Sequence, residues 1–227
     1  MPLRTTALTA ALITEEFPAT AFRVGRRSGA IHFAEIDAVD AANSKQGGRF
    51  DVVGGGVLYC ATTKTGAYKE VLADFRPSVK TYPIAEGETL MAQGSLPRSW
   101  REARALAEFS LEDPLSFVDI ESDATLTHLA SAMAERLDEL DVRALDVSLV
   151  RGPNRLLTRA IAQWVYTRVD DEGVPLYGGV RYLSRFQSQE CWAVFNGGVI
   201  GSVRTESILL SDAELTNVSR EFGITLH

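Results

Sequence analysis

Short apolar runs typical of β-strands and longer stretches with helical spacing follow one another in irregular order along these 227 residues. Regular alternation of strand and helix would predict a doubly wound parallel sheet, whereas irregular interspersion favours the α+β class. No internal repeat, low-complexity tract or long polar linker divides the chain. We therefore expect an α+β fold in a single domain over residues 1–227.

The positions of the expected elements follow from apolar periodicity and from turn and cap residues. Strands are expected at Ala21–Val24, Ala30–Ile36, Val57–Ala61, Thr89–Ala92, Ser116–Ile120, Gly179–Ser184, Cys191–Phe195 and Ile208–Leu210. Helices are expected from Thr62 or Thr63 to about Phe75, from Pro97 through Leu106, from Ser122 through Leu137, from Asn154 to about Val169, and from Ser211 or Asp212 to Gly223.

Charge is unevenly distributed along the chain. The formal net charge is −7, and the acidic excess lies within residues 101–150, where it fits the solvated face of a helix. We expect residues 97–170 to form a helical, acidic insertion. The nearly neutral flanks argue against a large basic nucleic-acid footprint and against direct nucleic-acid binding, but a few arginines could still hold a small anionic ligand.

The cysteine content and the first residues of the sequence indicate in which cellular compartment the protein is expected. Cys60 and Cys191 are the only cysteines and lie in apolar runs, so we expect buried thiols rather than a disulfide scaffold or a zinc site. The N-terminal apolar stretch is short and is followed by Glu15 and Glu16, which is atypical of a spanning helix or signal peptide. We expect a cytoplasmic protein with no membrane partner.

Several common catalytic motifs are absent from the sequence. The glycines of 54–56 precede a strand, whereas a dinucleotide-binding glycine loop follows one. No P-loop or G-x-S-x-G motif occurs, and His32, His128 and His227 lack neighbours at metal-ligand spacing. We therefore expect chemistry that needs no metal and no resident cofactor.

One segment, GGRFDVVGGGVLYCATTKTGAYKEVL, places polar side chains inside runs that otherwise resemble core. Arg49 lies in a glycine loop, Tyr59 follows in the next strand, and Glu70 lies on the helix after it. Because Ala67 and Val71 mark the buried side of that helix, Glu70 is expected close to the same side. A carboxylate there is either a satisfied structural group or part of a site.

Three further pieces complete a pattern: AFRV with Arg23, GGVRYLSR with Ser184 and Arg185, and WAVFN with Asn196. In their order and spacing, all these pieces and the closing REFGI resemble the RES-domain family, named for an arginine, a glutamate and a serine. The resemblance extends from Phe22 to Ile224 and is loose over residues 80–175. Two positions depart from the family pattern: Phe50 replaces a common tryptophan, and Asp51 replaces a frequent asparagine.

The resemblance implies an NAD-degrading enzyme with a split β core similar to that of ADP-ribosyltransferases. Family members are typically toxins of bacterial toxin–antitoxin pairs, so it also implies a helix-turn-helix antitoxin as partner, with NAD as substrate and inorganic phosphate or water as acceptor. The residues implied as catalytic are Arg49, Glu70 and Ser184, and those implied to bind NAD are Arg23, Tyr59, Arg185 and Asn196.

The residue types suit this chemistry. Cleavage of the nicotinamide–ribose bond develops positive charge on the ribose, which a fixed carboxylate such as that of Glu70 can stabilise. Guanidinium groups bind phosphates through paired hydrogen bonds, which suits Arg23, Arg49 and Arg185. An aromatic face such as that of Tyr59 can pack against the nicotinamide ring.

Each assignment also has a structural alternative. Arg49 could cap a loop carbonyl, Arg23 could serve in a structural ion pair, and Glu70 could face solvent. Tyr59 is ordinary in a core strand, Ser184 could simply end a strand, and Asn196 could be a turn residue before two glycines. At the level of function, the alternatives are ADP-ribosylation of a protein target and a non-enzymatic interaction module on the same fold.

Overall fold

The computed structural model describes residues 12–77 and 94–227, so the strand expected at Thr89–Ala92 lies outside the described residues. The helices are α1 (Ala38–Ala41), α2 (Lys64–Leu72), α3 (Arg98–Glu102), α4 (Asp123–Ala132), α5 (Ala134–Glu139), α6 (Val147–Arg151), α7 (Arg155–Tyr166) and α8 (Ala213–Phe222), with 3-10 turns η1 (Arg27–Gly29) and η2 (Ala73–Phe75). The strands are β1 (Thr14–Glu15), β2 (Ala21–Arg26), β3 (Ala34–Glu35), β4 (Gly56–Ala61), β5 (Ser95–Leu96), β6 (Arg104–Glu112), β7 (Phe117–Asp119), β8 (Gly179–Leu183), β9 (Glu190–Phe195), β10 (Val199–Ser207) and β11 (Thr225–Leu226).

The main sheet is joined at its middle by one residue pair. Its strand order is β1-β7-β8-β9-β4-β2-β6-β10, with β3 added to β4. Strands β4 and β2 pair only at Phe22 and Ala61, whereas β2 pairs with β6 along its whole length, from Ala21 to Arg26. The sheet therefore divides into two halves that diverge on either side of this junction.

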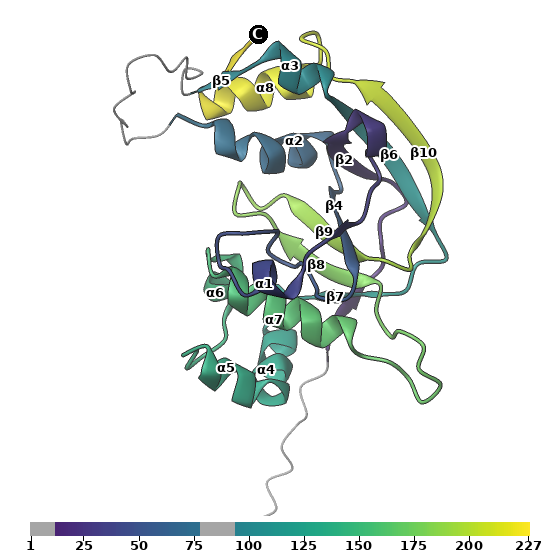
Figure 1. The fold of residues 1–227 in the computed structure, drawn as a ribbon, viewed down its shortest axis with the longest axis vertical. Helices are drawn as coiled ribbons and strands as arrows, with labels where there is room; N and C mark the ends of the chain where they lie inside the picture. Colours follow the sequence, from purple (N-terminus) through teal and green to yellow (C-terminus); the bar gives the residue numbers. More distant parts are fainter. Residues whose placement is uncertain (1–11, 78–93) are drawn as a thin grey trace, which may run out of the picture.

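The helices gather at the two ends of the molecule (Figure 1). Helices α2, α3 and α8 lie at one end, whereas α1 and α4 to α7 lie at the other, with the sheet running between them. The larger hydrophobic core joins residues of both helix groups to the sheet. A smaller core on the other face packs Phe117 edge-on against Trp192, with ring centroids 5.3 Å apart.

The expected α+β class with a split β core is confirmed. Local signals predicted several elements well: Thr63 caps α2 by accepting from the Gly66 amide, Asn154 caps α7, and α8 ends at Gly223 with φ of 68°. The two cysteines are buried and free, as expected. In the described ranges, no helix is long and apolar enough to cross a bilayer.

The helix expected from Pro97 through Leu106 is wrong beyond Ala103. The chain turns there and continues as β6, a strand hydrogen-bonded on both sides, to β2 and to β10. Ala105, Leu106 and Ala107 are all buried, so this segment lacks the alternation of apolar and polar residues that predicts a half-buried strand. Residues 97–170 thus contain strands β6 and β7 as well as helices; that they form a helical, acidic insertion stays a prediction.

Two other strand predictions are also corrected. Of the strand expected at Ala30–Ile36, Ala34–Glu35 forms β3 and Ile36 makes an isolated bridge to Val53, while Ile208–Leu210 forms no strand. The strand in that region is β10, Val199–Ser207, which lies at the sheet edge and is mostly exposed. Its polar sequence carries little apolar signal, which is why periodicity failed to predict it.

Candidate active site

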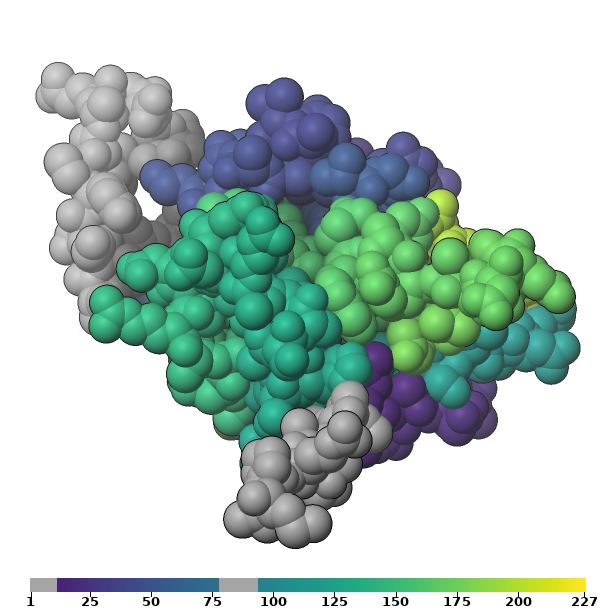
Figure 2. All heavy atoms as spheres, turned by 90° about the horizontal axis from the view of Figure 1, so that it is seen from below, coloured from purple at the N-terminus to yellow at the C-terminus, as the bar shows by residue number. Residues whose placement is uncertain are grey.

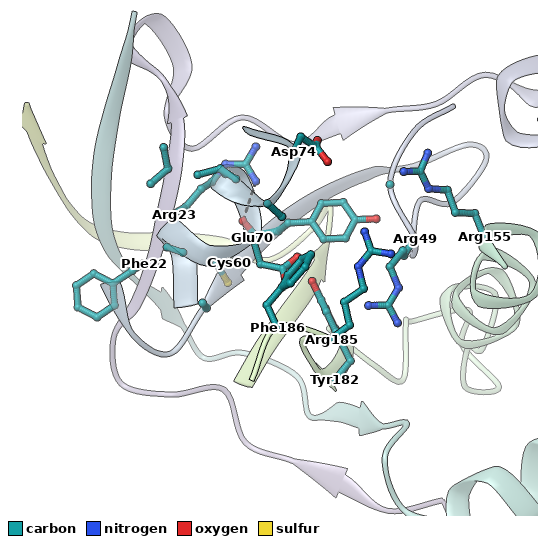
Figure 3. A pocket seen from close by; sticks show the side chains of 17 residues that line it. Phe22, Arg23, Arg49, Cys60, Glu70, Asp74, Arg155, Tyr182, Arg185 and Phe186 are labelled. Carbon is teal, nitrogen blue, oxygen red and sulfur yellow. Dashed lines mark hydrogen bonds between the residues drawn. The ribbon is translucent and has the colours of Figure 1, made fainter. Parts of the chain in front are cut away.

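A cleft of about 290 Å³ lies where the two halves of the sheet diverge (Figure 3). It is bounded by β2 and β4 at the junction, by α2, by the glycine loop before Phe50 and by the β8–β9 turn. Five of the seven predicted site residues line it directly: Arg23, Arg49, Tyr59, Glu70 and Arg185. The topology thus brings together residues that are distant in sequence.

Glu70 projects from α2 into the cleft, and Ser184, at the end of β8, holds it. The buried Ser184 hydroxyl donates a short hydrogen bond to Glu70 Oε1 and accepts one from the Phe186 amide at 2.9 Å. Ser184 therefore contacts the carboxylate without lining the cleft itself. These bonds fix the carboxylate orientation before any ligand binds, which is the preorganisation that electrostatic catalysis requires.

The loop that carries Arg49 is held by Tyr59 and Asp51. The Tyr59 hydroxyl donates to Asp51 Oδ1 at 2.7 Å and accepts from the Phe50 amide at 2.8 Å, while Asp51 also accepts from the Gly48 amide. Burial and the neighbouring Asp51 carboxylate raise the pKa of Tyr59 well above its ordinary value. The two departures from the family pattern are thus accommodated: Asp51 joins this network, and Phe50 is fully buried.

Arg49 is fixed by aromatic rings and by one carbonyl. Its guanidinium lies 5.1 Å from the Phe50 ring centroid and 5.4 Å from that of Tyr182, and it donates to the Val150 carbonyl. Its Nε atom is buried and has no hydrogen-bond partner among the described residues. Arg49 therefore does cap a carbonyl, as its structural alternative expects, but this bond leaves the Nε atom of the guanidinium without a hydrogen bond.

Arg23 lies at the other side of the cleft, on β2. It donates to the Tyr59 carbonyl at 2.7 Å, and its Nε atom is also buried without a partner among the described residues. Burial lowers the pKa of Arg23 from its ordinary value. In the described part of the chain it forms no ion pair within 4.0 Å, so the structural alternative of an ion-pair partner is not observed.

Sequence reasoning missed several lining residues. Tyr182 packs its ring 4.6 Å from that of Phe50, and burial raises its pKa well above the ordinary value. Arg155, at the start of α7, lines the same cleft, as do Asp74 and Phe186. Tyr182 and Phe186 flank the predicted Ser184 and Arg185, so the motif itself pointed to them, whereas Arg155 comes from a region that resembles the family only loosely.

Asn196 does not line this cleft. Its side-chain oxygen accepts from the Tyr166 hydroxyl at 3.3 Å, and its backbone amide donates to the Gly56 carbonyl at 2.8 Å. Asn196 lies at the end of β9 that is far from the β8–β9 turn. The structural alternative for Asn196, a turn residue before Gly197 and Gly198, is the one observed. Its side-chain type alone could not distinguish a ligand contact from this turn.

The cleft combines one fixed carboxylate with an excess of positive charge. Four arginines line it against two acids, Glu70 and Asp74. Such a site can bind an anion through guanidinium groups while holding a carboxylate beside a developing cation. In the described residues, no group of three or more His, Cys, Asp or Glu side chains could hold a metal ion.

Comparison with known proteins identifies the family. No curated protein matches the sequence. A chain of the solved M. tuberculosis MbcT–MbcA toxin–antitoxin complex is similar, with 14% identity and a TM-score of 0.44, covering 93% of this chain and 92% of that chain. The RES domain model matches residues 20–211, which include the junction, the glycine loop, α2 and the β8–β9 turn. The chain belongs to the RES domain family.

Proposed function

We propose that this protein degrades NAD by cleaving the bond between nicotinamide and ribose and transferring ADP-ribose to inorganic phosphate or water. The observation that carries the proposal is the Glu70 carboxylate, fixed by the Ser184 hydroxyl in a cleft lined by four arginines. A dinucleotide with two phosphates and a ribose that becomes cationic requires these two features together. Membership of the RES domain family supports the same reading.

In the proposed reaction, the bond from ribose C1′ to the nicotinamide nitrogen breaks, and its electron pair leaves with neutral nicotinamide. Glu70 stabilises the positive charge that develops on the ribose. An oxygen of phosphate or water then bonds to C1′, and a proton is released when water is the acceptor. The product is ADP-ribose phosphorylated at that carbon, or ADP-ribose.

The remaining side chains bind and orient the substrate. The four arginines that line the cleft would hold the phosphates through charge-assisted hydrogen bonds from their guanidinium groups. The rings of Tyr59 and Tyr182, and that of Phe186 at the cleft wall, offer apolar surface for the nicotinamide. Ser184 acts through Glu70 as a positioning residue.

The experiment is to incubate the purified protein with NAD, with and without inorganic phosphate, and to measure free nicotinamide and the ADP-ribose product. We expect release by the wild type and a loss of about 100-fold or more in Glu70→Gln, because the amide is isosteric but uncharged. Glu135→Gln, an exposed change on α5, is the matched control. Absence of release by the wild type, or equal release by Glu70→Gln, would contradict the proposal. Transfer of label to an added protein instead of phosphate or water would identify an ADP-ribosyltransferase.

We further propose that the protein acts as the toxin of a toxin–antitoxin pair in the cytoplasm, restrained by a helix-turn-helix antitoxin. Family membership supports this role. Expression of the chain alone should slow growth and lower cellular NAD, and Glu70→Gln should relieve both effects. Unimpaired growth at confirmed expression of active protein would contradict the toxin role.

A further inference from the structure

A second hollow of about 300 Å³ adjoins the cleft, and four of its six lining residues are basic. Its lining residues, which we call the basic annex, are Ser44, Lys45, Arg49, Pro153, Arg155 and Arg185. The annex shares Arg49, Arg155 and Arg185 with the cleft, so these arginines lie between the two spaces. Lys45 belongs to the annex alone.

The annex contains no carboxylate to balance its cations. In residues 12–77 and 94–227, none of its four basic side chains forms an ion pair within 4.0 Å, whereas Arg151, Arg181 and Arg204 elsewhere in the chain each pair with an acid. Arg155 instead donates to the Lys45 carbonyl at 2.7 Å, which fixes its direction and leaves its charge uncompensated. Like charges gathered without a counterion repel one another, so this arrangement favours an anionic ligand.

The main chain adds to the positive potential. Helix α7 begins at Arg155 and is capped by Asn154, whose side chain accepts from the Leu157 amide at 3.2 Å. Since Pro153 and Arg155 both line the annex, the positive end of this 12-residue helix lies at its wall. The helix end reinforces the four side chains and would not make a site alone.

The annex is separate from the carboxylate of the cleft. Figure 3 shows Arg49, Arg155 and Arg185 on one side and Arg23 on the other, with Glu70 between them. A phosphate in the annex would thus avoid the repulsion that Glu70 and Asp74 impose on an anion elsewhere in the cleft. The site therefore has two cationic ends, and only one lies away from carboxylates.

We propose that the basic annex is a phosphate-binding subsite in which Lys45 and Arg155 act together with Arg49 and Arg185. Its place in the reaction rests on the proposed function, because the phosphate is either free inorganic phosphate, the acceptor, or the pyrophosphate of the dinucleotide. Both sources present the same tetrahedral, anionic oxygen groups to the guanidinium forks. The chemistry of the annex fits a phosphoryl group in either case.

The test uses Lys45→Gln and Arg155→Gln, with Arg98→Gln as the control for loss of one positive charge at an exposed position. Lys45 is exposed, so its replacement leaves the fold intact even if Arg155→Gln loosens the loop that it contacts. Calorimetry with inorganic phosphate and with ADP-ribose measures binding directly. Nicotinamide release at varied NAD and varied phosphate gives a separate KM for each.

We expect Arg155→Gln to weaken phosphate or ADP-ribose binding about 10-fold and Lys45→Gln to do so severalfold, as for loss of one charge-assisted contact. A rise only in KM for phosphate assigns the annex to the acceptor, and a rise only in KM for NAD assigns it to the pyrophosphate. Binding constants and KM values of Lys45→Gln and Arg155→Gln that equal those of Arg98→Gln would overturn the proposal. Absence of binding of both inorganic phosphate and ADP-ribose to the wild type would also overturn it.

Failure of the two proposals can be told apart. If the wild type binds phosphate or ADP-ribose in an annex-dependent manner but releases no nicotinamide, the subsite stands and the NAD-degrading function fails. If the wild type releases nicotinamide with KM values that Lys45→Gln and Arg155→Gln leave unchanged, the function stands and the subsite fails.

Discussion

At the scale of single residues, Tyr59 performs two tasks from one position on β4. Its ring lines the cleft, and its hydroxyl bridges Asp51 and the Phe50 amide, which fixes the loop bearing Arg49. The same side chain thus serves the core and the site. The structural and functional interpretations of Tyr59 are therefore not exclusive.

Replacing Tyr59 by phenylalanine should affect stability and NAD binding together. The change leaves Asp51 Oδ1 without its donor and the Phe50 amide without its acceptor, so the free energy of unfolding should fall by about 1–3 kcal/mol. We also expect the KM for NAD to rise, because the Arg49 loop loses its anchor. Urea denaturation and nicotinamide-release kinetics measure the two effects. Tyr177→Phe, which removes a hydroxyl outside the cleft, should change neither, and an unchanged KM in Tyr59→Phe would show that the loop does not depend on this hydroxyl.

Ser184→Ala tests whether the serine acts through Glu70. Without the hydroxyl, the Glu70 carboxylate keeps its charge but loses its fixed orientation, so kcat should fall about 10-fold with little change in KM for NAD. Ser184→Thr retains a donor and should recover part of the activity. Ser202→Ala, in an exposed hydroxyl pair with Ser110, is the control. A fall of kcat as large as that of Glu70→Gln would instead indicate direct contact with substrate.

The residues of the cleft were predictable from the sequence to the extent that motif pieces carried them. Arg49, Glu70 and Ser184 come together as expected, because each lies next to a strong strand or helix signal. Asn196 was misplaced, since a side chain at a strand end gives no sign of which end of the sheet it occupies. Arg155 was missed because only the packing of α7 against the glycine loop brings it to the cleft.

At the scale of elements, the helical signals were reliable and the edges of the sheet were not. Caps at Thr63, Asn154 and Gly223 involve local backbone groups, so they can be read from short stretches of sequence. The formation of strand β10 depends on its pairing with β6, which lies about 90 to 100 residues earlier in the sequence. The single-pair junction between β2 and β4, which opens the cleft, has no sequence signal at all.

Helix α7 anchors the glycine loop through Arg159, which is only 5% exposed. Its guanidinium donates to the carbonyls of Gly48 at 3.0 Å, Ala41 at 2.7 Å and Asn43 at 3.0 Å, and also to that of Gln46. In Figure 2, the blue segment around residues 36–50 lies against the green helical part of the molecule, in agreement with these bonds. One side chain thus satisfies several carbonyls of a loop that has almost no regular structure.

Arg159→Lys should release this loop. A lysine keeps the charge but cannot reach carbonyls on several sides with a planar fork, so buried acceptors lose their donors. We expect the free energy of unfolding to fall by about 2–4 kcal/mol and amide exchange in residues 40–48 to accelerate. The control is Arg168→Lys, just beyond the same helix, where the guanidinium lies over the Trp164 ring. Exchange as slow as in the wild type would contradict a role for Arg159 in ordering the loop.

At the scale of the whole molecule, net charge and site charge have opposite signs. The chain carries −7, yet four arginines face two acids in the cleft, and the annex has no acid. Much of the acidic excess lies in α4, α5 and their flanks, on exposed positions such as Glu135 and Asp138. Net charge therefore describes the surface of this protein, and local packing determines the field at the site.

The whole fold should lose stability as the pH rises above about 9 to 10. Burial raises the pKa values of Tyr59, Tyr68 and Tyr182 above their ordinary value of 10.0, and does the same for the thiols of Cys60 and Cys191. At a pH below the ordinary pKa values, these groups are protonated in both the folded and the unfolded chain, so their full contribution to the free energy of unfolding is present. Above those values the unfolded chain releases protons that the folded chain retains, so unfolding becomes more favourable, by up to about 1.4 kcal/mol per pH unit for each group.

Tm measured from pH 7 to 11 should therefore be flat near neutrality and then fall steeply. Tyr59→Phe starts from a lower Tm but should fall less steeply, because one of the groups that titrates only on unfolding has been removed. Tyr177→Phe, which removes a hydroxyl outside the network around Asp51, is the control and should keep the steeper wild-type slope. An equal slope in wild type and Tyr59→Phe would mean that the Tyr59 hydroxyl ionises as readily in the folded protein as in the unfolded chain, and that the network around Asp51 is open to water.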